Sequence, residues 1–340
     1  MTNETNLLSE SAVRLFKDMT VSRNSTFREL WPAIEEMGFL LLLPAEGAGG
    51  LGGTPSHAFS VLKAAGHYAL PLPLAEGMIG HFICCRAGLA DLSGLTTVAW
   101  RHEGVFDGER FSGRLHAVPW GRDAERVVVC HGGGNFILRT TQASAVTRAE
   151  NTAGEARDTL TFERAPATPA AGPSALLLGA LLRTAQIVGA LQATLELSTT
   201  YANDRVQFGR SIGKFQVIQH NLAVFAAEAA AATAAGEAAT RAADLGDADF
   251  EIAAAKCRAN KAAAVGHTAA HAVHGAIGFT KEYPLNHLTR RLLSWRSEFG
   301  GQRYWNAWLG QRAMDMDGGG FWETLTARSD DLGLRSVGLK

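Results

Sequence analysis

The sequence predicts an α+β multidomain protein with an N-terminal helical domain, a small central β-barrel or β-sandwich, and a C-terminal four-helix bundle. Three observations lead to this order. Residues 1–94 show helical patterns broken by turns, residues 95–165 form short β-branched or alternating runs, and residues 174–340 are helical and rich in alanine. A Pro/Ala-rich stretch, APATPAAG at 166–173, is expected to link the last two parts.

The N-terminal domain is expected to consist of helices joined by loops. Residues 37–53, MGFLLLLPAEGAGGLGG, form an apolar run that ends at Pro44 and continues as a glycine-rich loop. No GK[ST] follows the glycines, so a phosphate-binding loop is not indicated. Pro71 and Pro73, within LPLP, mark a second extended turn.

The central domain is predicted from its short strands. The runs are TTVAW, RFSGRLHAV, RVVVCHG, NFILRTT and DTLTFER, separated by the turns FDGER, PWGRD and HGGGN. HGGGN is also reminiscent of an esterase oxyanion loop, but the chain contains no GxSxG elbow to accompany it. We therefore expect HGGGN to be a hairpin turn.

The C-terminal domain is predicted from helical periodicity and from helix ends. Apolar side chains repeat on one face from Leu177 to Leu195, Gly275 is a C-cap and Pro284 suits a first helical position. The expected helices cover 174–205, 216–244 and 249–274, then a helix from 284 and a last one near 301–316. Abundant alanine favours close packing of these helices in a bundle.

Composition excludes several functions. The chain has 340 residues, 46% hydrophobic, with a formal net charge of −1, which argues against binding to nucleic acid or to an anionic membrane. No unbroken run approaches the ~18 apolar residues of a membrane span, and the N-terminus is not a secretory signal, so a cytoplasmic location is expected. His267, His271 and His274 have helical spacing, but no carboxylate or cysteine accompanies them, so no metal is expected.

Four motifs carry a resemblance to a known family. RVQFGRSIGKFQ (205–216) is similar to the R-x-x-F-G…Q flavin-contact motif of acyl-CoA dehydrogenases, and HGAIGFTKEYPLNHLTR (274–290) to their HGG-x-G segment. LLLPAEGAGGLGG resembles the family's VPEEYGGLG turn, and FDGERFSGRLHAVPWG resembles its first β strands. Together the motifs span nearly the whole chain in the family's order.

The resemblance implies FAD as cofactor and a set of residues that hold it. Arg205 can bind the pyrophosphate through a charge-assisted fork, Phe208 offers an aromatic face near the adenosine, and Gln216 begins a helix whose N-terminus favours anions. Gln207 and Gly275 complete the expected cofactor set. In the family this loop reaches across a dimer interface to the neighbouring subunit's FAD.

The chain also departs from the family pattern near the flavin. The T-E-P-x-A-G-S-D loop that usually lines the flavin ring has no counterpart in LTTVAWRHEG at 95–104. Ala272 stands where a glutamine usually precedes the HGG-like motif, and Ala276 replaces its second glycine. These differences place part of the chain's own flavin contact in doubt.

The position of the catalytic base also departs from the family pattern. The family's reaction needs a carboxylate within hydrogen-bond reach of the substrate α-carbon. An ungapped count from Gly275 places the usual glutamate position at Phe299, and the alternative family position at Gly179. Glu298, one residue before Phe299, is therefore the candidate base; otherwise it is a surface partner for Arg296 or Arg291. His287 and Glu282 are weaker candidates for a site role.

Three functions remain open. The first is an FAD-dependent acyl-CoA dehydrogenase that converts an acyl-CoA to the 2,3-enoyl-CoA with Glu298 as base. The second is a non-catalytic subunit that shares a flavin site in a heterotetramer with a second acyl-CoA dehydrogenase chain acting on bulky CoA thioesters. The third is a helical scaffold that binds neither ligand. The resemblance also implies an electron-transferring flavoprotein as partner and, failing a heterotetramer, a homo-oligomer.

Overall fold

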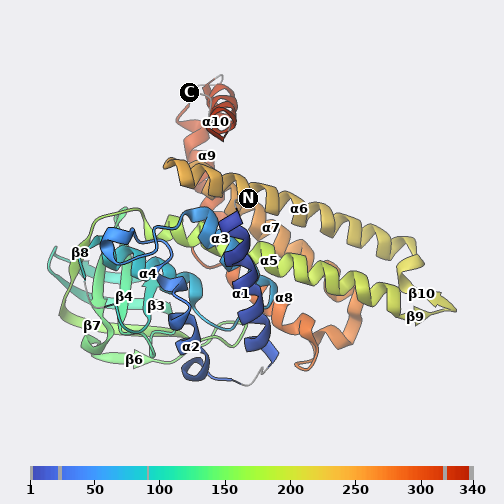
Figure 1. Ribbon diagram of the computed structural model, residues 1–340, viewed down its shortest axis with the longest axis horizontal. Helices are drawn as coiled ribbons and strands as arrows, with labels where there is room; N and C mark the ends of the chain where they lie inside the picture. The colour runs from blue at the N-terminus through green and yellow to red at the C-terminus, as the bar shows by residue number, and fades with distance from the viewer. Residues whose placement is uncertain (1–2, 22–24, 90–91, 317–319, 337–340) are drawn as a thin grey trace.

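The computed structural model describes residues 3–21, 25–89, 92–316 and 320–336. The N-terminal part is helical, as expected, and forms α1 (Asn3–Val21), α2 (Phe27–Glu36), α3 (Pro55–His67) and α4 (Leu74–Arg86), with short 3₁₀ helices at Phe39–Leu41 and Glu46–Ala48. Helix α3 begins at Pro55, directly after the N-cap Thr54, because a first helical position needs no backbone N–H donor. Helix α1 packs against α3 (Figure 1).

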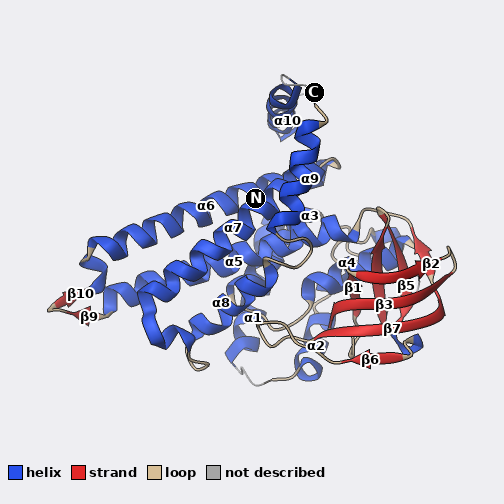
Figure 2. Ribbon diagram, turned by 180° about the vertical axis from the view of Figure 1, so that it is seen from behind, coloured by secondary structure: helices blue, strands red, loops and turns tan. Residues whose placement is uncertain are grey.

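The central part consists of two four-stranded sheets that face each other (Figure 2). The first has the order β1 (Thr96–Ala99), β4 (Arg126–His131), β5 (Gly134–Arg139) and β8 (Thr168–Ala170). The second has the order β2 (His102–Phe106), β3 (Arg110–Pro119), β7 (Arg157–Pro166) and β6 (Ala145–Thr147). Strand β1 pairs parallel with β4, and the other pairs of these two sheets are antiparallel.

The described strands form a sandwich, so the barrel alternative is wrong. Each sheet ends in two edge strands, and the buried side chains of Phe111, Phe136 and Phe162 fill the space between the sheets. The HGGGN segment is a hairpin turn in which Gly132 and Gly133 have φ values of 55° and 85°. The sequence did not predict β2, β6 or β8, and β8 lies inside the expected linker, where it pairs with β5.

The C-terminal part is built from four long or medium helices with an extension. The bundle contains α5 (Ala175–Asp204), α6 (Gln216–Leu245), α7 (Asp249–His274) and α8 (Pro284–Trp295). A small hairpin, β9 (Val206–Gln207) and β10 (Arg210–Ser211), joins α5 to α6, and a 3₁₀ helix at Gly275–Phe279 follows α7. Helices α9 (Gln302–Met314) and α10 (Gly320–Ser336) extend from the bundle, with α10 at the upper edge of Figure 1.

Helix α5 is the centre of the molecule. It packs against α3, α6, α7 and α8, and it crosses α3 closely because Gly66 and Gly189 lack side chains at the contact. A Cβ on Gly66 would lie 2.0 Å from the Gln186 carbonyl oxygen, and one on Gly189 would lie 1.9 Å from the Lys63 carbonyl oxygen. Both glycines are therefore required by the helix crossing.

Helices α5 and α6 are long and apolar enough to cross a membrane when judged by length and composition alone. The apolar window of α5 is 78% buried, as expected of a core helix. The window of α6 is only 28% buried, so much of its alanine-rich surface is exposed. Small side chains on an exposed helix permit close packing by another helix.

Candidate functional site

Glu298, the candidate base, lies in the turn between α8 and α9 and is 6% exposed. Nε and Nη2 of Arg157 lie 2.9 and 2.7 Å from its Oε1 atom. Nη2 of Arg183 lies 2.9 Å from Oε2. Glu298 is therefore not the surface partner of Arg296 or Arg291 that the sequence allowed, because its two partners come from the β domain and from the core of α5.

Glu298 is the centre of a longer series of buried charges. Glu155 lies 3.2 Å from Nη2 of Arg157 and 2.8 Å from Nε of Arg291, and Glu76 of α4 also pairs with Arg183. The buried charge chain is therefore Glu76, Arg183, Glu298, Arg157, Glu155 and Arg291, with alternating signs. It connects the N-terminal helices, the β domain and the bundle, and its three acids balance its three bases.

These contacts decide how readily Glu298 accepts a proton. Burial alone raises the pKa of Glu298, but the positive charges of Arg157 and Arg183 outweigh it and hold that pKa below its ordinary value. Asn151 adds a hydrogen bond from Nδ2 to Oε1 at 3.3 Å. An efficient general base has a pKa near the working pH. The two guanidinium groups move the pKa of Glu298 away from that value, so its carboxylate is a weak base.

Phe299 and Gly179 are in direct contact. Phe299 is fully buried with a φ of 51°, a left-handed conformation that is uncommon for a bulky residue. A Cβ on Gly179 would lie 2.0 Å from the Phe299 ring, so the glycine makes room for that ring. Trp100 covers it from the β domain, with ring centroids 4.4 Å apart. The space around Gly179 is thus filled by aromatic side chains.

Lys256 lies beside the buried charge chain and was not predicted from the sequence. It is fully buried on α7, and its ammonium group donates to Oδ1 of Asn260 at 2.7 Å and to the Trp295 carbonyl oxygen at 3.0 Å. Burial, reinforced by the positive charge of Arg183, lowers the pKa of Lys256 from 10.5 to about 7.

This lowered pKa predicts a pH-dependent stability. Between pH 7 and 10.5 the unfolded chain binds a proton at Lys256 that the folded chain lacks, so stability rises with pH over this range. Relative to the variant Lys256→Met, the wild type should therefore gain unfolding free energy from pH 7 to 10.5. Chemical unfolding at both pH values measures the difference, with Lys261→Met as a control on the exposed face of the same helix. A pH-independent difference would contradict the expectation.

The residues expected to hold FAD lie at the other end of α5. Arg205, Gln207, Phe208 and Gln216 are all exposed around the hairpin that joins α5 to α6, and Phe208 is 91% exposed. Phe208 and Gly209 form the hairpin turn with φ values of 53° and 77°. Figure 1 shows this hairpin at the tip of the bundle, away from the β domain.

Gly275 is held close to this end of the bundle by an aromatic contact. The ring of His274 stacks on Tyr201, one turn before Arg205, with centroids 4.5 Å apart. Gly275 itself has a φ of 64° and is exposed. The motif that ends at Gln216 and the motif that contains Gly275 therefore meet in the structure, although 59 positions separate these two residues in the chain.

The two weaker candidates for a site role lie near the start of α8. His287 bonds the Lys281 carbonyl oxygen at 2.9 Å, and Glu282 is exposed.

The residues around Glu298 and the residues expected to hold FAD do not form one site within the chain. Gly179 and Arg205 lie 26 residues apart along α5, which corresponds to ~39 Å of helix. A ligand held by Arg205 therefore belongs to a different place from the Glu298 cluster of the same chain.

Two of the three helical histidines are in ring contact with each other, and the third, His274, stacks on Tyr201. The rings of His267 and His271 lie 4.6 Å apart, and that of His271 stacks on Phe279 at 4.1 Å. Nε2 of His271 is 3.0 Å from Oγ1 of Thr289. Burial, with the nearby His267 and His274, lowers the pKa of His271 to about 4. Within the described ranges, no group of three or more His, Cys, Asp or Glu residues has the geometry of a metal site.

Comparison with known proteins identifies relatives for most of the chain. Residues 173–302 match the model for the C-terminal domain of acyl-CoA dehydrogenases. The acyl-CoA dehydrogenase IpdE2 of Mycobacterium tuberculosis is 30% identical over 262 residues, which cover 76% of this chain and 78% of that protein.

Solved structures share the fold over nearly the whole chain. A variant of the Tcur3481-Tcur3483 steroid ACAD superposes with a TM-score of 0.83 at 24% identity, covering 92% of this chain and 98% of that one. The ChsE4-ChsE5 complex of Mycobacterium tuberculosis gives a TM-score of 0.80 at 21% identity, covering 94% and 99%. At these identities the likeness establishes the three-part architecture.

Proposed function

Because this chain belongs to the acyl-CoA dehydrogenase family, we propose that it is a subunit that completes the flavin site of a second acyl-CoA dehydrogenase chain and has no base of its own. Membership of the family places it among oxidoreductases that act on acyl-CoA thioesters. In this proposal, this chain contributes flavin contacts and the partner chain contributes the catalytic base.

The contact between Phe299 and Gly179 carries the proposal. The resemblance to the family implies that the base stands at one of these two positions, and the Phe299 ring occupies the space that a side chain at position 179 would need. Here one position has no side chain and the other has an aromatic ring that fills the space. Neither can accept a proton from a substrate α-carbon.

Glu298 is the remaining candidate base, and its surroundings favour a structural role. To reach a substrate, its carboxylate would have to leave both Arg157 and Arg183, and each of these buried guanidinium groups would lose one of its two carboxylate partners. The same arginines keep its pKa low. The catalytic role of Glu298 stays a prediction, and the catalytic enzyme, the first hypothesis from the sequence, becomes the second candidate function.

The hairpin at the end of α5 supports a role in holding FAD. The guanidinium group of Arg205 makes no hydrogen bond or ion pair with the described residues and is exposed, and Gln216 is the first residue of the 30-residue helix α6. A phosphate group can therefore meet a free arginine beside a helix N-terminus. Gln207, Phe208 and Gly275 would flank the adenosine half. When bound, FAD accepts the hydride that leaves Cβ of an acyl thioester.

The relatives suggest the class of substrate and partner. One structural neighbour is titled a steroid ACAD, and another is a complex of two different chains. We extend this to a heterotetramer that acts on bulky, ring-bearing CoA thioesters, with an electron-transferring flavoprotein as acceptor. The exposed alanine-rich face of α6 suits packing against a partner helix. A homo-oligomer and a cytoplasmic location also stay predictions.

The flavin content of the chain purified alone tests the proposal. We expect little bound flavin and no acyl-CoA-dependent dye reduction by the chain alone, and a flavin-containing complex when it is co-expressed with an acyl-CoA dehydrogenase chain encoded beside it. Full flavin occupancy and turnover by the chain alone would overturn the proposal. Glu298→Gln, compared with the exposed Glu282→Gln, would then show whether Glu298 is the base.

A further inference from the structure

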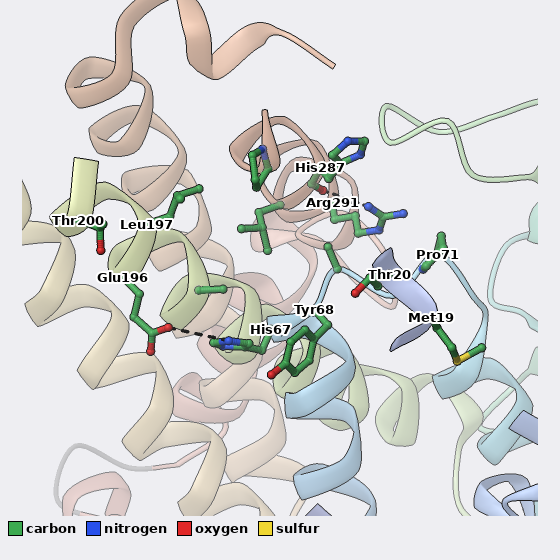
Figure 3. A pocket seen from close by; sticks show the side chains of 14 residues that line it. Met19, Thr20, His67, Tyr68, Pro71, Glu196, Leu197, Thr200, His287 and Arg291 are labelled. Carbon is green, nitrogen blue, oxygen red and sulfur yellow. Dashed lines mark hydrogen bonds and ion pairs between the residues drawn. The ribbon is translucent and has the colours of Figure 1, made fainter. Parts of the chain in front are cut away.

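A cavity of about 390 Å³ lies on the side of the bundle, and Arg291, the last member of the buried charge chain, is one of its lining residues. The end of α1, the end of α3, the middle of α5 and the start of α8 enclose it (Figure 3). Of the residues of α5 that line it, Ala193 is the nearest to Gly179, at 14 residues or ~21 Å along the helix. The volume falls within the range of ~300–1,000 Å³ that is usual for small-molecule sites.

The walls of this cavity combine apolar surface with a few polar groups. Met19, Leu197 and Leu288 supply apolar side chains from three different helices. Figure 3 shows Arg291 beside Thr20, while Glu196 extends from the opposite wall toward His67, at 3.9 Å. An amphipathic ligand would find apolar contacts along its body and a cation at one end.

Arg291 is held in a fixed position at the edge of the cavity. The residue is 6% exposed, its Nε atom donates to Oε1 of Glu155 at 2.8 Å, and its Nη1 atom donates to the His287 carbonyl oxygen at 3.2 Å. Among the described residues, Nη2 has no hydrogen-bond partner. Because its other nitrogens are already fixed, this atom can receive an anion with little loss of side-chain entropy.

We propose that this cavity is an accessory binding site for a carboxylate with a hydrocarbon chain of medium length, whose carboxylate group bonds Nη2 of Arg291. One open guanidinium nitrogen suits a carboxylate oxygen, whereas a phosphate group usually collects several donors. The hydrocarbon chain lies against Met19, Leu197 and Leu288. Neither Glu298 nor any residue expected to hold FAD lines the cavity, and the proposal does not depend on the function proposed above.

Calorimetric titration with octanoate tests this site. The titration uses the full chain, either alone or in complex with a second acyl-CoA dehydrogenase chain. We expect one octanoate bound per chain, and binding weaker by roughly tenfold or more for 1-octanol, which lacks the charge that Arg291 recognises. No detectable octanoate binding, or equal binding of octanol, would overturn the proposal.

Two variants separate the site from general binding of fatty acids. Arg291→Gln should weaken octanoate binding by roughly tenfold or more, whereas the neighbouring Arg290→Gln should leave it unchanged. Because Arg291 also ends the buried charge chain, Leu197→Trp provides a second test that fills the cavity and keeps the arginine. Octanoate affinity that survives Leu197→Trp in a folded protein would place the ligand elsewhere and refute the assignment.

Discussion

Replacing Arg205 with alanine is expected to remove most of the flavin from the complex that contains this chain. A hydrogen bond to a charged group contributes about 1.5–3 kcal/mol, so the dissociation constant of FAD should rise roughly 10- to 150-fold. Fold stability should be unaffected, because Arg205 is exposed and its guanidinium group makes no hydrogen bond or ion pair with the described residues. Flavin absorbance after gel filtration, together with a titration of added FAD, measures the change.

A control variant, Arg241→Ala, shows whether the loss of flavin is specific to Arg205. Arg241 is also exposed on α6 but lies near the opposite end of that helix, so Arg241→Ala removes the same charge far from the hairpin. We expect normal flavin content in that variant. If Arg205→Ala also kept its flavin, the hairpin would not be a cofactor loop, and the hypothesis of a ligand-free scaffold would gain support.

Local signals explain why so much of the fold could be predicted from the sequence. The boundaries of α7 were predicted to the residue, Asp249–His274, and α8 begins at Pro284 as expected, since caps and proline act within one helical turn. Strand β2 was missed because HEGVF has a glutamate and a glycine where β-branched residues are usual. It forms because all five of its residues pair with β3.

The chemistry around Glu298 could not be predicted in the same way. Arg157 lies 141 residues before Glu298 and Arg183 lies 115 residues before it, so no local pattern joins them. Within the local sequence, Arg296 and Arg291 were the available partners for Glu298. In the fold, Glu298 pairs with Arg157 and Arg183 instead. Arg291 is connected to Glu298 only through Glu155 and Arg157. Four of the cofactor residues, in contrast, lie within one 12-residue motif, Arg205 to Gln216.

Arg183→Met is expected to cause the largest loss of stability of any single change in the charge chain. Arg183 is 2% exposed, pairs with Glu76 and Glu298, and lies over the rings of Trp295 and Phe299 at 5.5 and 5.4 Å. Methionine keeps much of the volume but leaves two buried carboxylates without this cation. Removal of one partner from a buried pair costs about 3–5 kcal/mol. Chemical unfolding at neutral pH measures it, and the exposed Arg303→Met should change stability by less than about 0.5 kcal/mol.

The pH dependence of this loss distinguishes a missing charge from poor packing. In the wild type the pKa of Glu298 is lowered, so its contribution to stability is present above the unfolded value of 4.5 and is lost as the pH falls through the folded value. Without Arg183, one of the two cations that lower the pKa of Glu298 is gone, so that pKa is higher than in the wild type and the carboxylate takes up a proton at a higher pH. The difference in unfolding free energy should therefore shrink between pH 7 and about pH 4. A packing defect alone would give the same difference at both pH values, and that result would refute an electrostatic role for Arg183.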